Sequence, residues 1–164
     1  IDFLREKGLS AATKKSSRAT KDGLVTSYIH MGGKVGVMIE VNCETDFVAK
    51  TEDFKTLTRD LAMHVAAMNP LYVKPEDVPE AALQREKDIY RKQVIAEGKP
   101  EKIADKIVEG KLKKYYEEVC LVKQKFIKDT NQTVEDLIKA AIAKTGENIL
   151  VKRFVRYQLG GDES

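Results

Sequence analysis

The side chains that could perform covalent chemistry are few, and none has the neighbours that such chemistry requires. The two histidines, His30 and His64, have no companions at the spacing of metal ligands, and the patterns H-E-x-x-H, C-x-x-C and G-x-S-x-G do not occur. The run "GGKVG" (32–36) lacks the spacing of a phosphate-binding loop. The sequence therefore predicts a protein that is not an enzyme and that uses no metal ion and no cofactor.

The cysteines and histidines are better explained as structural residues. Cys43 and Cys120 stand inside apolar patterns, so we expect buried free thiols, as in a reducing compartment, in preference to a disulfide. His64 lies beside an apolar helix stripe and is expected to be half-buried and hydrogen-bonded. His30, at the end of a strand next to a glycine turn, is expected to be exposed.

One aromatic side chain has an unusual position, because Asp46-Phe47 stands where a strand pattern gives way to a helix pattern. Phe47 precedes Phe54 by seven residues, so a helix that began this early would place Phe47 in the core. Thr45, however, is a good N-cap, and an acid in the first turn is favoured by the helix dipole. A rigid aromatic at a helix start that projects past the core would resemble an interface hot spot. The residues alone leave both alternatives open.

The sheet that must position these residues is predicted from three strand patterns. Residues 24–30 and 35–43 flank "MGGK", whose two glycines allow the positive φ angles of a tight hairpin turn. In the second strand apolar residues alternate with others, which indicates one buried face. A third pattern rich in β-branched and aromatic residues spans 149–159. The expected fold class is α+β, with a three-stranded antiparallel sheet packed on helices.

Two core helices are predicted beside the sheet. Apolar residues recur every three or four positions over 51–67, and "NPLYVKP" ends that helix. The second core helix runs over 134–144, with Thr133 as its N-cap, Asp136 three residues later and Gly146 at its end.

The middle of the chain has a different character and predicts a protruding antiparallel helical hairpin, of the coiled-coil kind. Two helical stretches over 79–119 are interrupted at "GKP", and their apolar stripes are narrow enough to bury only against each other. Each helix would be roughly 30 Å long. The expected organisation is therefore an α+β core of residues 10–78 and 120–161, with 79–119 as an insertion. Residues 1–9 resemble the last turn of a helix from a missing N-terminal domain.

The charge pattern leaves a nucleic-acid alternative open. The 164 residues are 42% hydrophobic and 34% charged, and the net charge of +3 is too mild to indicate nucleic-acid binding. A cluster of Lys111, Lys113 and Lys114 next to Tyr115 and Tyr116 could contact phosphates and stack on bases. Acids interleave with these lysines, so a solvated hairpin and no direct nucleic-acid contact is the favoured interpretation. A ribosome- or RNA-associated basic binding module is the alternative.

No apolar run reaches the roughly 18 residues that span a bilayer, and the first residues do not have the pattern of a signal peptide. We expect no membrane association. The compartment is expected to be the bacterial cytoplasm, or an organelle matrix if the chain comes from an organelle.

Several stretches together are similar to one family, bacterial-type translation elongation factor Ts. "NCETDFVAK" (42–50) resembles its signature, and "AATKKSSRATKDGLV", "LAMHVAAMNPLYVKPEDVP", "GKPEKIADKIVEGKLKKYYEEVCLVKQKFIKD" and "TGENILVKRFVRYQLG" are similar to it in family order. The resemblance spans nearly the whole chain. It implies a guanine-nucleotide exchange factor that binds elongation factor Tu and promotes GDP release.

The resemblance also implies partner-binding residues. Asp46 and Phe47, with Thr45 and Val48, match the segment that in the family intrudes near the magnesium and switch region of the GTPase. On this basis Phe47 is expected at an exposed tip, with Val48 packed beneath it.

Further positions match partner-contacting residues of the family. His30 matches a histidine, Gly146 a glycine at the same tip, and Lys15, with a weaker match, a lysine. Thr145 precedes Gly146 where the family has an aliphatic residue, so the resemblance does not extend to an apolar contact there. The family's single-core forms are homodimers, which implies pairing of two chains through their sheets.

Overall fold

The computed structural model describes residue 10 and residues 12–161, which form two compact units. The first unit comprises Ile1–Asn69 with Lys125–Ser164, and the second comprises Pro70–Gln124. The predicted remnant of an N-terminal domain, residues 1–9, lies outside the described residues. Residues 12–15 form a helical turn, and Ala12 within it is buried.

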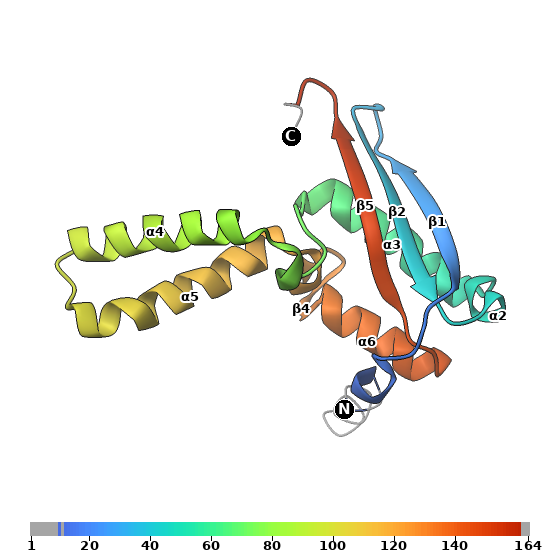
Figure 1. Cartoon of the computed structure of the whole chain (residues 1–164). Helices are drawn as coiled ribbons and strands as arrows, with labels where there is room; N and C mark the ends of the chain where they lie inside the picture. The colour runs from blue at the N-terminus through green and yellow to red at the C-terminus, as the bar shows by residue number, and fades with distance from the viewer. Residues whose placement is uncertain (1–9, 11, 162–164) are drawn as a thin grey trace. The chain divides into compact units, whose positions relative to one another are not determined.

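The first unit contains the predicted three-stranded antiparallel sheet (Figure 1). Strand β1 (Asp22–Ile29) pairs with β2 (Val35–Cys43), and β2 pairs on its other side with β5 (Leu150–Gln158). The tight turn between β1 and β2 uses positive φ angles at Gly32 and Gly33, as the sequence predicts. The central strand thus has both neighbours hydrogen-bonded, and its alternating side chains decide which face of the sheet is buried.

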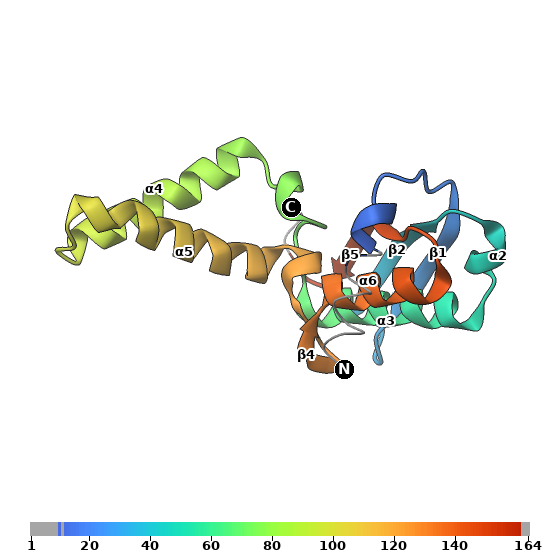
Figure 2. The same ribbon diagram turned by 90° about the horizontal axis from the view of Figure 1, so that it is seen from below.

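Helix α3 (Glu52–Met68) covers one face of this sheet, and α6 (Val134–Thr145) lies beside α3 (Figure 2). Apolar side chains of α3 and of the inner face of β2 form the core. Its fully buried members include Ile39, Val41, Phe54, Leu61 and Val65. Both core helices begin at threonine N-caps, of which the sequence predicted Thr133. Thr51 and Thr133 accept hydrogen bonds from the backbone nitrogens of Phe54 and Asp136, and Asp136 completes a capping box.

A small hairpin of β3 (Lys125–Phe126) and β4 (Asp129–Thr133) was not predicted. Its residues are mostly polar and do not alternate, so they carry no strand signal. The hairpin explains why His64 is fully buried and not half-buried as expected. The backbone nitrogen of Ile127 donates to His64 Nδ1 at 3.2 Å, and the ring of Phe126 stacks on the imidazole with centroids 6.1 Å apart.

The second unit contains the predicted antiparallel helical hairpin. Helix α4 (Glu80–Ala96) packs along α5 (Glu101–Val119), and Gly98 takes a positive φ of 74° in the turn between them (Figure 1). Short 3-10 turns, Pro75–Asp77 and Leu121–Lys123, flank the pair.

The seam between α4 and α5 is narrow, as the sequence predicts. Ala104 is buried in this seam, whereas the side chain of the neighbouring Ile103 is 41% exposed. The small alanine side chain lets the two helices approach closely near the turn. Among the described residues no helix is long and apolar enough to cross a membrane.

A test of the sheet is available at Gly23, which pairs with Asn42 and has a φ of +145°. A Cβ at this position would lie 2.1 Å from the carbonyl oxygen of Val41. We expect Gly23→Ala to lower the free energy of unfolding by roughly 3 kcal/mol or more, measured by urea denaturation. Gly110→Ala in α5 is the control, because the added methyl group would have nothing within 4 Å and alanine favours a helix. Equal stability of the Gly23→Ala chain and the wild type would contradict the described register.

The cysteines offer a second test. Cys43 and Cys120 are buried free thiols, as predicted. Burial raises the pKa of each thiol to about 11, and for Cys43 the Glu147 carboxylate adds to the rise. At pH 8 the thiolate fraction is then on the order of a thousandth. We expect iodoacetamide to leave both thiols unmodified in the folded chain and to alkylate both in urea, as measured by mass spectrometry. Complete alkylation of the folded chain within minutes would show that the described burial is wrong.

Candidate partner-binding site

The segment Thr45–Val48 forms an exposed tip at the start of a short helix, α2 (Asp46–Ala49). Thr45 is extended, with φ −130° and ψ 153°, and its hydroxyl oxygen accepts a hydrogen bond from the backbone nitrogen of Val48 at 3.3 Å. Phe47 is 81% exposed, whereas Val48 is 6% exposed. The predicted N-cap, the exposed aromatic and the buried valine beneath it are all confirmed.

The alternative that placed Phe47 in the core fails because the helix is not continuous. Helix α2 ends at Ala49, with Lys50 as its C-cap, and Thr51 returns to an extended conformation before α3 begins. Helical periodicity holds only along one helix axis, so the spacing of seven residues between Phe47 and Phe54 does not align their side chains. Phe54 is buried, and Phe47 points away from the core.

The acid of the tip has a partner on the same helix. Lys50 Nζ lies 2.7 Å from Asp46 Oδ2, and this hydrogen bond and charge raise the pKa of Lys50. Both side chains are largely exposed. A cation or another donor that approached Asp46 would therefore compete with a solvent-exposed lysine, which holds its partner weakly.

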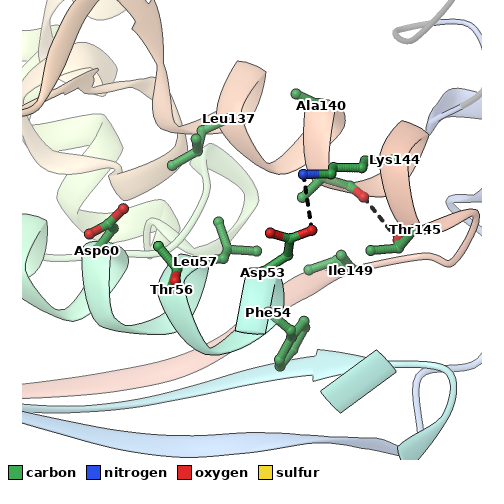
Figure 3. Close-up of a pocket in the computed structure, with 11 residues that line it drawn as sticks. Asp53, Phe54, Thr56, Leu57, Asp60, Leu137, Ala140, Lys144, Thr145 and Ile149 are labelled. Carbon is green, nitrogen blue, oxygen red and sulfur yellow. Dashed lines mark hydrogen bonds and ion pairs between the residues drawn. The ribbon is translucent and has the colours of Figure 1, made fainter. Parts of the chain in front are cut away.

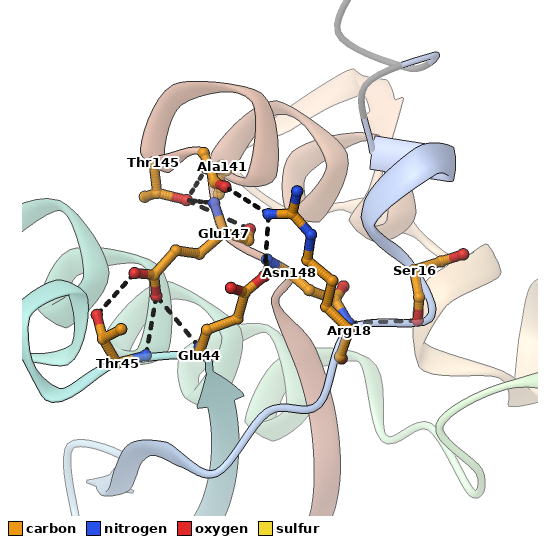
Figure 4. Close-up of polar contacts among 9 residues, drawn as sticks. Ser16, Arg18, Glu44, Thr45, Ala141, Thr145, Glu147 and Asn148 are labelled. Carbon is orange, nitrogen blue, oxygen red and sulfur yellow. Dashed lines mark hydrogen bonds and ion pairs between the residues drawn. The ribbon is translucent and has the colours of Figure 1, made fainter.

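A carboxylate from a distant part of the chain holds the backbone just before the tip (Figure 4). Glu147 Oε1 accepts hydrogen bonds from the backbone nitrogens of Glu44, at 3.2 Å, and Thr45, at 3.0 Å. The hydroxyl group of Thr45 donates to Glu147 Oε2 at 2.6 Å. Sequence reasoning missed Glu147, because the contact joins residues about a hundred positions apart. Its position directly after a helix-ending glycine was the one available signal.

Gly146 lies at this same end of the first unit. It ends α6 in the left-handed conformation, with φ 77°, and its carbonyl oxygen accepts from Arg18 Nη1 at 3.5 Å. Thr145, the residue without an aliphatic side chain, instead donates its hydroxyl hydrogen to the carbonyl oxygen of Ala141 at 2.9 Å. Thr145 also accepts from the backbone nitrogen of Glu147 at 3.2 Å. The hydroxyl thus fixes the end of α6.

The other two predicted contact residues lie in different places. Lys15 is half-buried on the helical turn 12–15, next to Ser16, whose carbonyl oxygen accepts from Asn148 Nδ2 at 3.3 Å. That turn therefore lies near the tip. His30 does not, because it follows the far end of β1, which is roughly 25 Å long. His30 is exposed, as predicted, and its Nδ1 lies 3.0 Å from the hydroxyl oxygen of Tyr28.

A groove of about 240 Å³ separates α3 from α6 (Figure 3). Apolar side chains such as Phe54, Leu57 and Leu137 line it. An ion pair spans it, with Lys144 Nζ 2.9 Å from Asp53 Oδ2. Among the described residues no group of three histidine, cysteine, aspartate or glutamate side chains is placed to hold a metal ion.

Comparison with known proteins agrees with the motifs that form the tip. The family model described as "Elongation factor TS" matches residues 9–161. "Elongation factor Ts" of Syntrophus aciditrophicus is 69% identical over 98% of this chain and 80% of that relative. The proteins of the same name from Heliobacterium modesticaldum and Desulfosudis oleivorans are 56% and 55% identical over 98% of this chain, and over 74% and 81% of their own lengths. The chain therefore belongs to the elongation factor Ts family.

Proposed function

We propose that this chain is a guanine-nucleotide exchange factor, which binds elongation factor Tu in its GDP form and promotes GDP release during translation elongation. Family membership supports this role, and the exposed tip at Thr45–Val48 is the observation that carries it. The bacterial relatives favour the bacterial cytoplasm over an organelle matrix as the compartment.

The tip suits a partner that must be held in a nucleotide-free conformation. Burial of the Phe47 side chain in an apolar pocket of the partner would contribute roughly 2–3 kcal/mol. If the pocket opens only when nucleotide is weakly held, this contact shifts the GDP affinity by roughly 30- to 150-fold. Coupling of two ligands is reciprocal, so GDP weakens the binding of the exchange factor by the same factor.

Asp46 adds an electrostatic contribution in this proposal. A carboxylate brought beside the Mg²⁺ of the GTPase would compete for its water ligands, and Mg²⁺ tolerates little departure from octahedral geometry. The role involves no making or breaking of covalent bonds, so we propose that the chain is not an enzyme in the covalent sense. It also needs no metal ion or cofactor of its own.

The RNA-associated alternative is not favoured. Family membership argues against it, and so do the contacts of Lys111, the first lysine of the cluster 111–114, with side chains of α4. Lys111 Nζ lies 3.3 Å from Gln93 Oε1 and 5.8 Å from the centroid of the Tyr90 ring. These contacts hold the Lys111 side chain against α4, so it is less free to reach a phosphate than the sequence alone suggests.

We also propose a homodimer that pairs two chains through their sheets. No described residue of the first unit covers the face of the sheet opposite α3, and this face exposes several apolar side chains. They are Val25, Ile29, Met38, Val155 and Tyr157. Their registers place Met38 between Ser27 and Val155, at the centre of this outer face. An apolar face of this kind is typical of a protein interface.

Phe47→Ala tests the exchange role. Without the ring, the contact that distinguishes the two states of the partner is lost, and we expect the acceleration of GDP release to fall by roughly tenfold or more. The measurement is stopped-flow release of a fluorescent GDP from elongation factor Tu. The fold should be unchanged, because Phe47 is exposed and contributes little to the core. Ile127→Ala, at another exposed apolar residue, is the control. Normal exchange by the Phe47→Ala chain would refute the proposed role of the tip.

Met38→Glu tests the dimer. A carboxylate at the centre of the outer face would be desolvated in the interface without a partner, so we expect the variant to be monomeric. Light scattering at high concentration should give twice the chain mass of 18.4 kDa for the wild type and the single-chain mass for Met38→Glu. Ile127→Glu introduces the same charge elsewhere and should remain dimeric. A monomeric wild type at every accessible concentration would exclude the dimer.

A further inference from the structure

We propose that Glu147 is the positioning residue of the partner-binding tip. Its carboxylate fixes the backbone of Glu44 and Thr45, and through them the direction in which Phe47 points. The test by GDP release rests on the proposed function. The test by hydrogen exchange of the backbone amides does not.

The hydrogen bonds at Thr45 show how the position is transmitted. A threonine hydroxyl has one hydrogen to donate. At Thr45 that hydrogen goes to Glu147 Oε2 at 2.6 Å, so a lone pair faces the backbone nitrogen of Val48 at 3.3 Å. Glu147 thereby orients the N-cap that starts α2. The same carboxylate holds the backbone nitrogens of Glu44 and Thr45, so the segment has little freedom to rotate.

Glu147 is itself held on both sides. On one side Gly146 ends α6, and the hydroxyl of Thr145 accepts from the backbone nitrogen of Glu147. On the other side Asn148 is only 4% exposed, and its Nδ2 donates to the carbonyl oxygens of Ser16, at 3.3 Å, and Arg18, at 3.0 Å. The side chain therefore extends from a loop that is fixed before and after it.

A second carboxylate, that of Glu44, holds the loop that carries Glu147. Glu44 Oε1 accepts from the backbone nitrogen of Asn148 at 2.8 Å and lies 3.6 Å from Arg18 Nη1 (Figure 4). Glu44 thus holds the loop of Glu147, while Glu147 holds the backbone of Glu44. The guanidinium of Arg18 offsets part of the repulsion between the two acids. Three segments, 16–18, 44–45 and 146–148, are joined here by these polar contacts.

The buried side chains of Val48 and Ala49 anchor the second half of α2, so the support is needed at its start, where Asp46 and Phe47 are exposed. Helix α2 has four residues, and helices this short are not stable in isolation. Phe47 is exposed and so does not anchor the tip to the core. Without Glu147 the tip would occupy several orientations, and the apparent affinity for a partner falls in proportion to the competent fraction.

Glu147→Ala in the whole chain tests this role through two kinetic quantities. Loss of a charged hydrogen-bond acceptor should raise the half-saturating concentration in GDP release by roughly tenfold or more. The maximal rate at saturation should stay within about twofold, because the partner still selects the competent orientation and Phe47 is intact. Glu147→Gln keeps an acceptor oxygen, so its half-saturating concentration should lie between those of the wild type and Glu147→Ala. Glu135→Ala, an ion-paired acid at the other end of α6, is the control.

A structural measurement accompanies the kinetics. Hydrogen exchange of the backbone amides of Glu44 and Thr45, followed by NMR, should become roughly tenfold or more faster in Glu147→Ala. The amides of Ile39 and Val41 in β2 should be unchanged. If the variant does not fold, Thr45→Val carries the test, because it removes the hydroxyl group's bond to Glu147 together with the N-cap on Val48 that this bond orients. It should raise the half-saturating concentration, and Thr130→Val on β4 is its control.

Three results would overturn the proposal. One is a half-saturating concentration within twofold of the wild type. Another is a loss confined to the maximal rate, which would place Glu147 among the groups that act on the partner. The last is unchanged exchange of the Glu44 and Thr45 amides. If the wild-type chain itself does not accelerate GDP release, the proposed function fails, and the amide exchange alone then decides whether Glu147 holds the tip.

Discussion

The interruption of helix between Lys50 and Thr51 is the constraint on which the presentation of Phe47 depends. Thr51 is extended, and its hydroxyl oxygen caps α3. The chain direction therefore changes between the buried Val48 and the buried Phe54. A single helix through this region would have turned Phe47 inward with the other apolar residues. The threonine cap is thus a small, local feature that separates an exposed aromatic from a core aromatic seven residues later.

Local features of the sequence predicted most of the fold. The alternation in 35–43 and the glycine turn before it predicted β2 and its hairpin, because both act over a few residues. The caps Thr45 and Thr133 predicted where α2 and α6 begin for the same reason. Periodicity misled where it was extended across a break, from Phe54 back to Phe47. A helical period carries no information about whether the helix is continuous.

The parts that could not be predicted depend on contacts between distant segments. The hairpin of β3 and β4 has a polar sequence, and it is stabilised by what it covers, His64 and the end of α3. Glu147 is one acid among 26 acidic residues, and only the folded chain shows that it reaches Thr45. The distance between His30 and the tip, in contrast, follows from the predicted hairpin, because His30 lies at the turn and the tip follows the opposite end of β2.

In the proposed mechanism positioning and exchange are different tasks, and different atoms perform them. A contact that is equal in the nucleotide-bound and nucleotide-free partner raises affinity for both and leaves the coupling unchanged. Glu147 lies within this chain and reduces the conformational cost of binding in either state. The ring of Phe47 can enter a pocket that exists in one state only, so its contribution is differential. A rigid support beneath an exposed aromatic therefore strengthens association without weakening the discrimination between the two states, and selection can adjust the two properties separately.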